Sequence, residues 1–170
     1  MNKYYAGIGS RETPLDVLRQ MINIAKYLDK TGYTLRSGHA DGADQIFGVG
    51  ATKAEIWLPW KSFNSGKKVA HHVYNVIDPN DKEAYDSIKF HPAANTLKSS
   101  VCSLMARNFR QIIGRNNESN SEFVVCWTKD GKDTGGTGQA LRIAAHYNIP
   151  IYNLYFSEKY DEIMSLCGDL

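Results

Sequence analysis

Short apolar runs alternate with helical segments along the first 60 residues, and this alternation limits the folds open to the chain. Residues 4–8, 33–37 and 55–58 have the length and composition of strands. Between them, apolar side chains recur at helical spacing from about Pro14 to Lys30, and a second helical stretch covers about residues 43–53. Strands joined through helices run parallel, with right-handed crossovers. The sequence therefore predicts an α/β fold with a mostly parallel sheet.

The second half of the chain continues this pattern after a weaker middle region. From Pro59 to about Ser100 the sequence reads as loop and broken helix, interrupted by Pro79 and Pro92. Further strands are expected over residues 123–127 and 151–155, and further helices over residues 97–113, 138–147 and 158–166. We therefore predict a Rossmann-like three-layer fold with a mostly parallel sheet, in which residues 1–170 form a single domain.

Composition excludes several classes of protein. The chain is 42% hydrophobic and 22% charged, which is ordinary for a globular domain, and it lacks an apolar run of about 18 residues that could span a bilayer. The N-terminal sequence lacks the pattern of a secretory signal, so we expect a cytoplasmic location with no membrane partner. A net charge of +2 does not by itself indicate nucleic-acid binding.

The cysteines and histidines give no sign of a metal site. Cys102, Cys126 and Cys167 show no CxxC spacing, and the five histidines show no HExxH pairing. Cys126 lies inside an apolar run, where a buried thiol is the expected role. We expect no disulfide framework, no bound metal and no cofactor.

A glycine-rich stretch, TGGTGQALRIA from Thr134 to Ala144, lies between two predicted strands. Gly135, Gly136 and Gly138 lack Cβ atoms, so backbone N–H groups can approach an anion there. A helix beginning near Gly138 would add the positive end of its dipole. The pattern favours a binding site for a nucleotide or sugar phosphate; the alternative is a tight surface turn with no ligand.

Two more loops of this kind follow predicted strands. GSRETP follows the first strand and SGHADGAD follows the second, while TKDGKDTGGTG follows residues 123–127. The carboxyl ends of parallel strands share one edge of the sheet, so these loops should converge where ligands bind. Hydroxyl and guanidinium groups in them could bind a phosphate or ribose phosphate, the donors being Ser10, Arg11, Ser37, Thr134 and Thr137. The alternative is that each loop is an ordinary turn.

The motifs GxGSRxxP, SGxAxGAD, RNFRQIIGRN and GGTGxAxRxA occur in this order along nearly the whole chain. In this combination the sequence resembles the SLOG superfamily of Rossmann-like proteins. That superfamily includes the LONELY GUY-type phosphoribohydrolases, the Rossmann domain of DNA-processing protein A and the YspA/YpsA-related proteins. The layout is most similar to that of the DNA-processing and YspA/YpsA-related branch.

The resemblance implies a ligand that is a nucleotide or an ADP-ribose-derived small molecule. The residues implied to bind it or its phosphate are Gly9, Ser10, Arg11, Ser37, Gly38, Gly42, Ala43, Asp44, Arg107, Asn108, Arg115, Thr134, Gly135, Gly136, Thr137 and Gly138. The layout does not choose between Arg107 with Asn108 and Arg115 with Asn116 as the pair that enters the pocket. Trp127, which ends a strand at the ligand edge, is the best candidate to stack on a base, with core packing as the alternative.

Catalysis is left open by the sequence. The phosphoribohydrolases carry the signature GGxGTxxE, whose glutamate is part of their catalytic apparatus, whereas Gln139 and Arg142 stand at the corresponding positions here. Cleavage of an N-glycosidic bond develops positive charge on the sugar, which a carboxylate stabilises and a cation opposes. Asp44 is a weak candidate for that carboxylate, and the alternative is that it accepts backbone N–H bonds near a helix start.

Three functions are therefore compatible with the sequence. The first is a protein that binds a nucleotide-derived small molecule as a sensor, a sequestering protein or a weak hydrolase. The second is a phosphoribohydrolase that acts on a nucleoside monophosphate. The third is a module that binds single-stranded DNA through Lys67, Lys68, Arg107 and Arg110. The resemblance also implies a homo-oligomer, most simply a dimer.

Overall fold

The strands form one parallel sheet. A computed structural model describes residues 2–115 and 119–168, with side chains described as far as residue 166, so that Asn116 and the Cys167 side chain lie outside the described residues. The strands of this part of the chain are β1 (Lys3–Gly7), β2 (Tyr33–Ser37), β3 (Ala54–Leu58), β4 (Val73–Val76), β5 (Val124–Cys126) and β6 (Ile151–Asn153). They are arranged in the order β4-β3-β2-β1-β5-β6, and every neighbouring pair is parallel.

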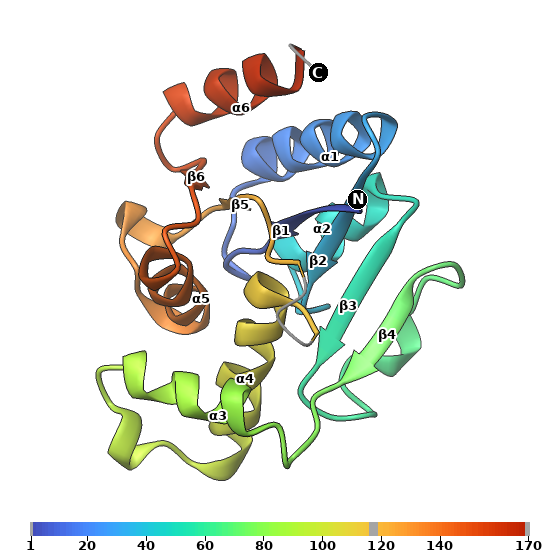
Figure 1. The fold of residues 1–170 in the computed structure, drawn as a ribbon. Helices are drawn as coiled ribbons and strands as arrows, with labels where there is room; N and C mark the ends of the chain where they lie inside the picture. Colours follow the sequence, from blue (N-terminus) through green and yellow to red (C-terminus); the bar gives the residue numbers. More distant parts are fainter. Residues whose placement is uncertain (1, 116–118, 169–170) are drawn as a thin grey trace.

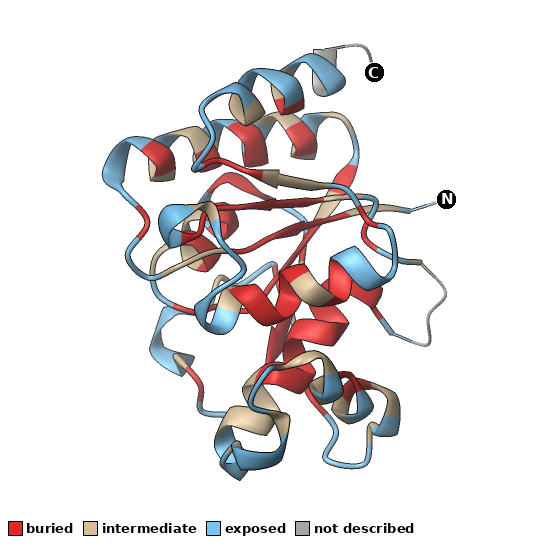
Figure 2. Cartoon of the chain, turned by 90° about the vertical axis from the view of Figure 1, so that its left-hand side faces the viewer, coloured by how far each residue is buried: buried red, intermediate tan, exposed pale blue. Residues whose placement is uncertain are grey.

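Helices cover both faces of the sheet, which confirms the predicted three-layer α/β fold (Figure 1). One face carries α1 (Leu15–Lys30), α2 (Ala43–Gly50) and α6 (Glu158–Gly168). The other face carries α4 (Ser99–Ile113) and α5 (Gly135–His146), with the short α3 (Lys82–Asp86) packed outside α4. Buried residues gather in the strands and on the helix faces turned toward them (Figure 2).

The apolar pattern of the sequence explains the two core layers. In α1, Met21, Ile24, Ala25 and Leu28 are fully buried at helical spacing, after Pro14 has set the extended conformation that precedes the helix. Strand β5 is buried along its whole length, because helices cover both of its faces. Such a strand must be apolar throughout, and its sequence is VVC.

The middle of the chain differs from its prediction. Residues 73–76 form strand β4, where the sequence was expected to be broken helix. This strand lies at the sheet edge and pairs only with β3, so Val73 and Val76 are 62% and 46% exposed. A short edge strand has no buried face to impose a clear apolar alternation, which is why its pattern is weak.

Several element boundaries also differ from expectation. Helix α2 ends at Gly50 rather than near residue 53, and β6 ends at Asn153 rather than at residue 155. Helix α5 begins at Gly135, with Thr134 as its N-cap, rather than near Gly138. The glycine-rich turn is therefore the first turn of the helix itself. This places its backbone N–H groups at the positive end of α5.

Candidate functional site

The order of the strands reverses between β1 and β5. The chain builds outward from β1 to β4 and then returns to place β5 on the other side of β1. The loop after β1 leads to α1 on one face, and the loop after β5 leads to α5 on the opposite face. The two loops therefore separate and leave an opening at the carboxyl edge, which is where open α/β sheets bind ligands.

A cavity of about 550 Å³ occupies this opening. The three loops predicted to converge all contribute to its wall, through residues 8–12 after β1, Ala40 and Asp44 after β2, and residues 128–129 and 134–137 after β5. Helix α4 forms another wall. Ten of the sequence-predicted residues line the cavity, namely Gly9, Ser10, Arg11, Asp44, Arg107, Asn108, Thr134, Gly135, Gly136 and Thr137.

Five predicted residues lie behind the wall rather than on it. The Ser37 hydroxyl is buried and donates to the carbonyl of Gly7 over 2.7 Å, and the Gly38 carbonyl accepts from the Arg107 guanidinium. Of the other three, Gly42 lies close to the backbone of Ser10 and Arg11, Gly138 lies close to the Asp133 carbonyl, and Ala43 is fully buried beside Gly9. These residues shape the cavity without facing it.

Arg115 lies elsewhere. Its exposed guanidinium donates to Asn75 Oδ1 over 2.8 Å and borders a separate depression on the sheet face. Arg107 and Asn108, in contrast, are buried in α4 and line the cavity. Of the two pairs that the motif offered, the structure brings Arg107 with Asn108 to the cavity. Asn116 lies outside the described residues.

The first turn of α5 opens into the cavity. The first amides of a helix have no acceptor within it, so the N–H groups of Gly135, Gly136 and Thr137 are available to a ligand. Asn108 fixes this turn by donating from Nδ2 to the Gly136 carbonyl over 2.9 Å, and Gly138 N–H donates to the Thr134 carbonyl over 3.1 Å. The turn is thus held in place from α4 before any ligand arrives.

Two glycines of this turn differ in what packing demands of them. A Cβ at Gly138 would collide with the carbonyl of Asp133, so the fold itself requires glycine there. A Cβ at Gly136 would meet no atom within 4 Å, and its backbone φ is not in the left-handed region. Packing therefore does not explain Gly136, whereas a ligand seated close to the backbone would.

Asp44 joins two of the loops. Its Oδ1 accepts the N–H of Gly9 over 3.2 Å and its Oδ2 accepts the N–H of Ala40 over 3.3 Å. Burial raises the pKa of this carboxyl, and the Arg107 Nη1 atom, 4.0 Å from Oδ2, opposes that rise. Because both carboxylate oxygens hold backbone N–H groups, the geometry favours the structural alternative for Asp44 over a catalytic role.

Gln111 is a cavity residue that the sequence did not reveal. It follows Arg107 by one turn of α4, so both side chains lie on the same helix face. Gln111 is 1% exposed and Arg107 is 7% exposed, and both line the cavity. Within the described residues, Gln111 Nε2 and Arg107 Nε have no hydrogen-bond partner. Burial lowers the Arg107 pKa, although a guanidinium remains charged.

Other lining residues were not among the predicted ligand contacts. The wall includes four apolar side chains, those of Ile8, Leu104, Met105 and Ala140. It also includes the buried Thr128 and the exposed Glu12 and Lys129, of which Glu12 was expected at the rim of the site. For Gln111, its spacing of one helical turn from Arg107 was the one signal in the sequence that could have placed it at the cavity. Trp127 is 8% exposed within the core and does not line the cavity.

Arg142 does not enter the cavity. It donates to the Asp133 carbonyl over 2.7 Å and to Gln139 Oε1 over 3.2 Å, on the outer side of α5. Gln139 is buried and donates to the Ser87 carbonyl over 2.9 Å. The two positions that correspond to the phosphoribohydrolase signature therefore fix the α5 turn. Neither supplies the carboxylate that glycosidic cleavage needs.

Arg110, expected as a contact to DNA, is used inside the protein. Its Nε donates to Asp81 over 2.7 Å, and its Nη2 lies 2.6 Å from Asp81 and 3.3 Å from Glu83. Lys67, from the same predicted set, pairs with Asp41 over 2.6 Å at the surface. These two cations are thus already matched by carboxylates.

The described residues give two further findings. None of their helices is long and apolar enough to cross a membrane. Their histidines, cysteines and carboxylates do not gather into any group of three or more that could hold a metal ion.

The fold and the position of its cavity are those of Rossmann-like α/β proteins, which bind ligands where the strand order reverses. A solved structure of DNA processing protein A from Helicobacter pylori superposes on this chain with a TM-score of 0.65 and 18% sequence identity. The match covers 98% of this chain and 81% of that one, and it supports a fold like that of DNA processing protein A. No family model and no curated protein matches the sequence.

Replacing Asp44 with alanine should destabilise the fold. The variant would leave the N–H groups of Gly9 and Ala40 without their acceptors and Arg107 without its buried counter-charge, at a cost of about 3–5 kcal/mol. Urea unfolding measures this loss. Asp41→Ala, at an exposed carboxylate in the same loop, is the matched control and should leave the unfolding midpoint nearly unchanged. Equal effects of the two substitutions would contradict the structural role of Asp44.

Proposed function

We propose that this protein binds a phosphorylated nucleotide or an ADP-ribose-like molecule in the cavity between the β1 and β5 loops. The observation that carries the proposal is the first turn of α5, whose N–H groups open into the cavity beside Gly136. A helix N-terminus stabilises a phosphate through these N–H groups and through its dipole. Arg11 and Lys129 line the same cavity and add positive charge.

The size and the lining of the cavity suit a ligand of this class. Its volume of about 550 Å³ lies within the roughly 300–1,000 Å³ of small-molecule sites. The apolar side chains of Ile8, Leu104 and Met105 offer a surface for a sugar or a base. Such a mixture of apolar walls and a few placed polar groups is typical of pockets for organic ligands.

The buried donors on α4 indicate what the other end of the ligand presents. Arg107 Nε and Gln111 Nε2 are buried without an acceptor among the described residues, which is costly unless a ligand oxygen or nitrogen accepts from them. Both belong to side chains that line the cavity. We therefore assign to the ligand a phosphate at the α5 turn and a second hydrogen-bond acceptor that reaches the α4 wall.

Substitution of the α5 turn should remove binding without unfolding the protein. Calorimetric titration with a panel of nucleoside monophosphates, nucleoside diphosphates, ADP-ribose and cyclic nucleotides should give saturable binding of at least one. Gly136→Val, which places a side chain in the phosphate position, and Arg11→Ala should each weaken that binding at least about tenfold, the effect of losing roughly 1.4 kcal/mol.

Gly66→Val is the matched control, because a Cβ at Gly66 also meets no atom within 4 Å but Gly66 does not line the cavity. It should bind as the unmodified protein does. Absence of binding across the whole panel would contradict the proposal, and so would a Gly136→Val variant that keeps full affinity while remaining folded.

A second candidate function is binding of single-stranded DNA, with one nucleotide unit of the strand seated in the same cavity. The fold likeness to DNA processing protein A favours it, because the structure of that protein was described for its single-stranded DNA binding mode. The rim of the cavity is also open to solvent, since Arg11, Lys129, Thr134 and Gly135 are exposed.

Binding of a strand should depend steeply on salt. Fluorescence anisotropy with a labelled oligothymidylate should show binding at low salt, and the logarithm of the affinity should fall with a slope of about −0.7 per phosphate contact as salt is added. Double-stranded DNA of the same length is the control and should bind more weakly. A strand that gives no anisotropy change even at low salt would reject this second function.

A further inference from the structure

We infer that a second nucleotide subsite lies across the loop 129–134 from the cavity, in a depression between α5, β6 and the start of α6. A ligand that fills both places is a single-stranded nucleic acid rather than a mononucleotide. The inference rests on the proposed binding of a nucleotide in the cavity. The inference adds the direction in which a bound strand leaves the cavity.

The depression adjoins the cavity directly. It encloses about 510 Å³ and is lined on one side by residues 131–134 and on the other by Phe156 and Lys159. Thr134 lines both the depression and the cavity. A chain that passes over Thr134 therefore goes from one to the other without leaving the surface.

Cations stand on both sides of this crossing. Lys129 lines the cavity and Lys132 lines the depression, and in the described part of the chain neither forms an ion pair. Arg142 also lines the depression, and its buried Nε atom has no hydrogen-bond partner in the part of the chain that the structure describes. The carboxylate of Asp133 lies 3.6 Å from Arg142 Nη1, and Lys159 pairs with Glu162 over 2.7 Å. Two unmatched lysines thus remain to follow a phosphate backbone.

One exposed aromatic ring, that of Phe156, lines the same depression, and the ring of Tyr155 lies against it. Tyr155 and Phe156 are 46% and 43% exposed, and their ring centroids lie 5.2 Å apart at an interplanar angle of 86°. The turn that carries them is fixed, because Asn153 Oδ1 accepts the Tyr155 N–H over 3.1 Å. Exposed rings beside cations are the platforms on which unpaired bases stack.

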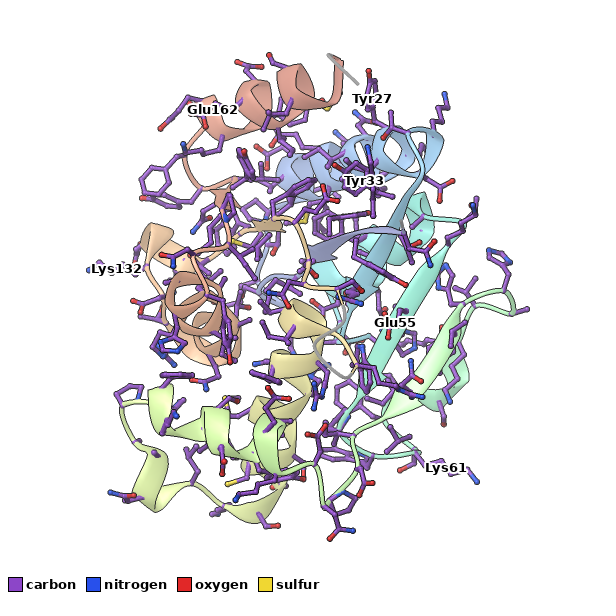
Figure 3. The ribbon with its side chains drawn as sticks, in the orientation of Figure 1. Tyr27, Tyr33, Glu55, Lys61, Lys132 and Glu162 are labelled. Carbon is purple, nitrogen blue, oxygen red and sulfur yellow. The ribbon has the colours of Figure 1, made fainter. Side chains whose placement is uncertain are left out.

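A path for the strand on the opposite side of the cavity, toward the loop after β3, has weaker support. Trp60 is 39% exposed there and Lys61 is exposed as well, but no residue of the stretch 59–68 lines the cavity. Figure 3 shows Lys132 and Lys61 on opposite sides of the molecule. Because Thr134 lines both the cavity and the depression, a bound strand is expected to leave the cavity on the side of Lys132 and Phe156.

The experiment compares thymidylate with oligothymidylates of increasing length, up to about eight nucleotides, by calorimetry and anisotropy. In the unmodified protein the affinity should rise beyond one nucleotide. Phe156→Ala should lower the affinity for the longer oligothymidylates at least about fivefold, which is the smallest effect expected from losing one base–aromatic stack. Its affinity for thymidylate alone and its urea unfolding midpoint should stay unchanged.

Trp60→Ala is the matched control, since it removes an aromatic ring of similar exposure on the other side. It should keep the gain with length. Loss of the gain in Trp60→Ala but not in Phe156→Ala would overturn the inference, and so would an affinity that does not rise with length. Failure of thymidylate and of every other nucleotide in the panel to bind would instead contradict the proposed function of the cavity, and the oligothymidylate comparison still decides the subsite.

Discussion

The reversal of strand order between β1 and β5 is the constraint on which the site depends. Two parallel strands that are neighbours in the sheet send their following helices to opposite faces, so no loop closes the gap between them. The cavity exists because of this topology and does not need any particular side chain to open it. What the side chains add is the chemistry of its wall. The first turn of α5 supplies backbone donors, and α4 supplies Arg107, Asn108 and Gln111.

Helix α4 holds the site together as well as lining it. Asn108 fixes the α5 turn through the Gly136 carbonyl, while Arg107 contacts the Gly38 carbonyl and lies near Asp44. Asp44 in turn ties the loop after β1 to the loop after β2. The donors are therefore arranged before a ligand binds, which lowers the entropy that binding would cost. Among the described residues, Arg107 Nε and Gln111 Nε2 are the buried donors of this wall that have no acceptor within the protein.

Much of this arrangement could be predicted from the sequence, for physical reasons that differ between elements. Strand β5 and helix α1 are buried on the sides that their apolar residues mark, so periodicity found them. Edge strand β4 has no such marked face and was missed. The convergence of three loops followed from the parallel topology alone.

The directions of individual side chains could not be predicted in the same way. Arg107 and Arg115 occupy similar motif positions, but one lies within α4 and the other lies beyond its end, where it meets Asn75. Gln111 is a neutral amide within a helix, and only its spacing of one helical turn from Arg107 distinguishes it from a surface residue before the cavity is seen. Arg142 stands at the position that corresponds to the catalytic glutamate of the phosphoribohydrolases, but its guanidinium donates to the Asp133 carbonyl outside the cavity.

The central claim is that a phosphate binds at the first turn of α5. The most direct measurement is a ¹⁵N–¹H correlation titration of the folded protein with nucleotides, read at the amides of Gly135, Gly136 and Thr137. Phosphate oxygens that accept these N–H groups should move the three resonances downfield in a saturable way. Saturation at other amides while these three remain in place, or no change with any nucleotide, would contradict the account.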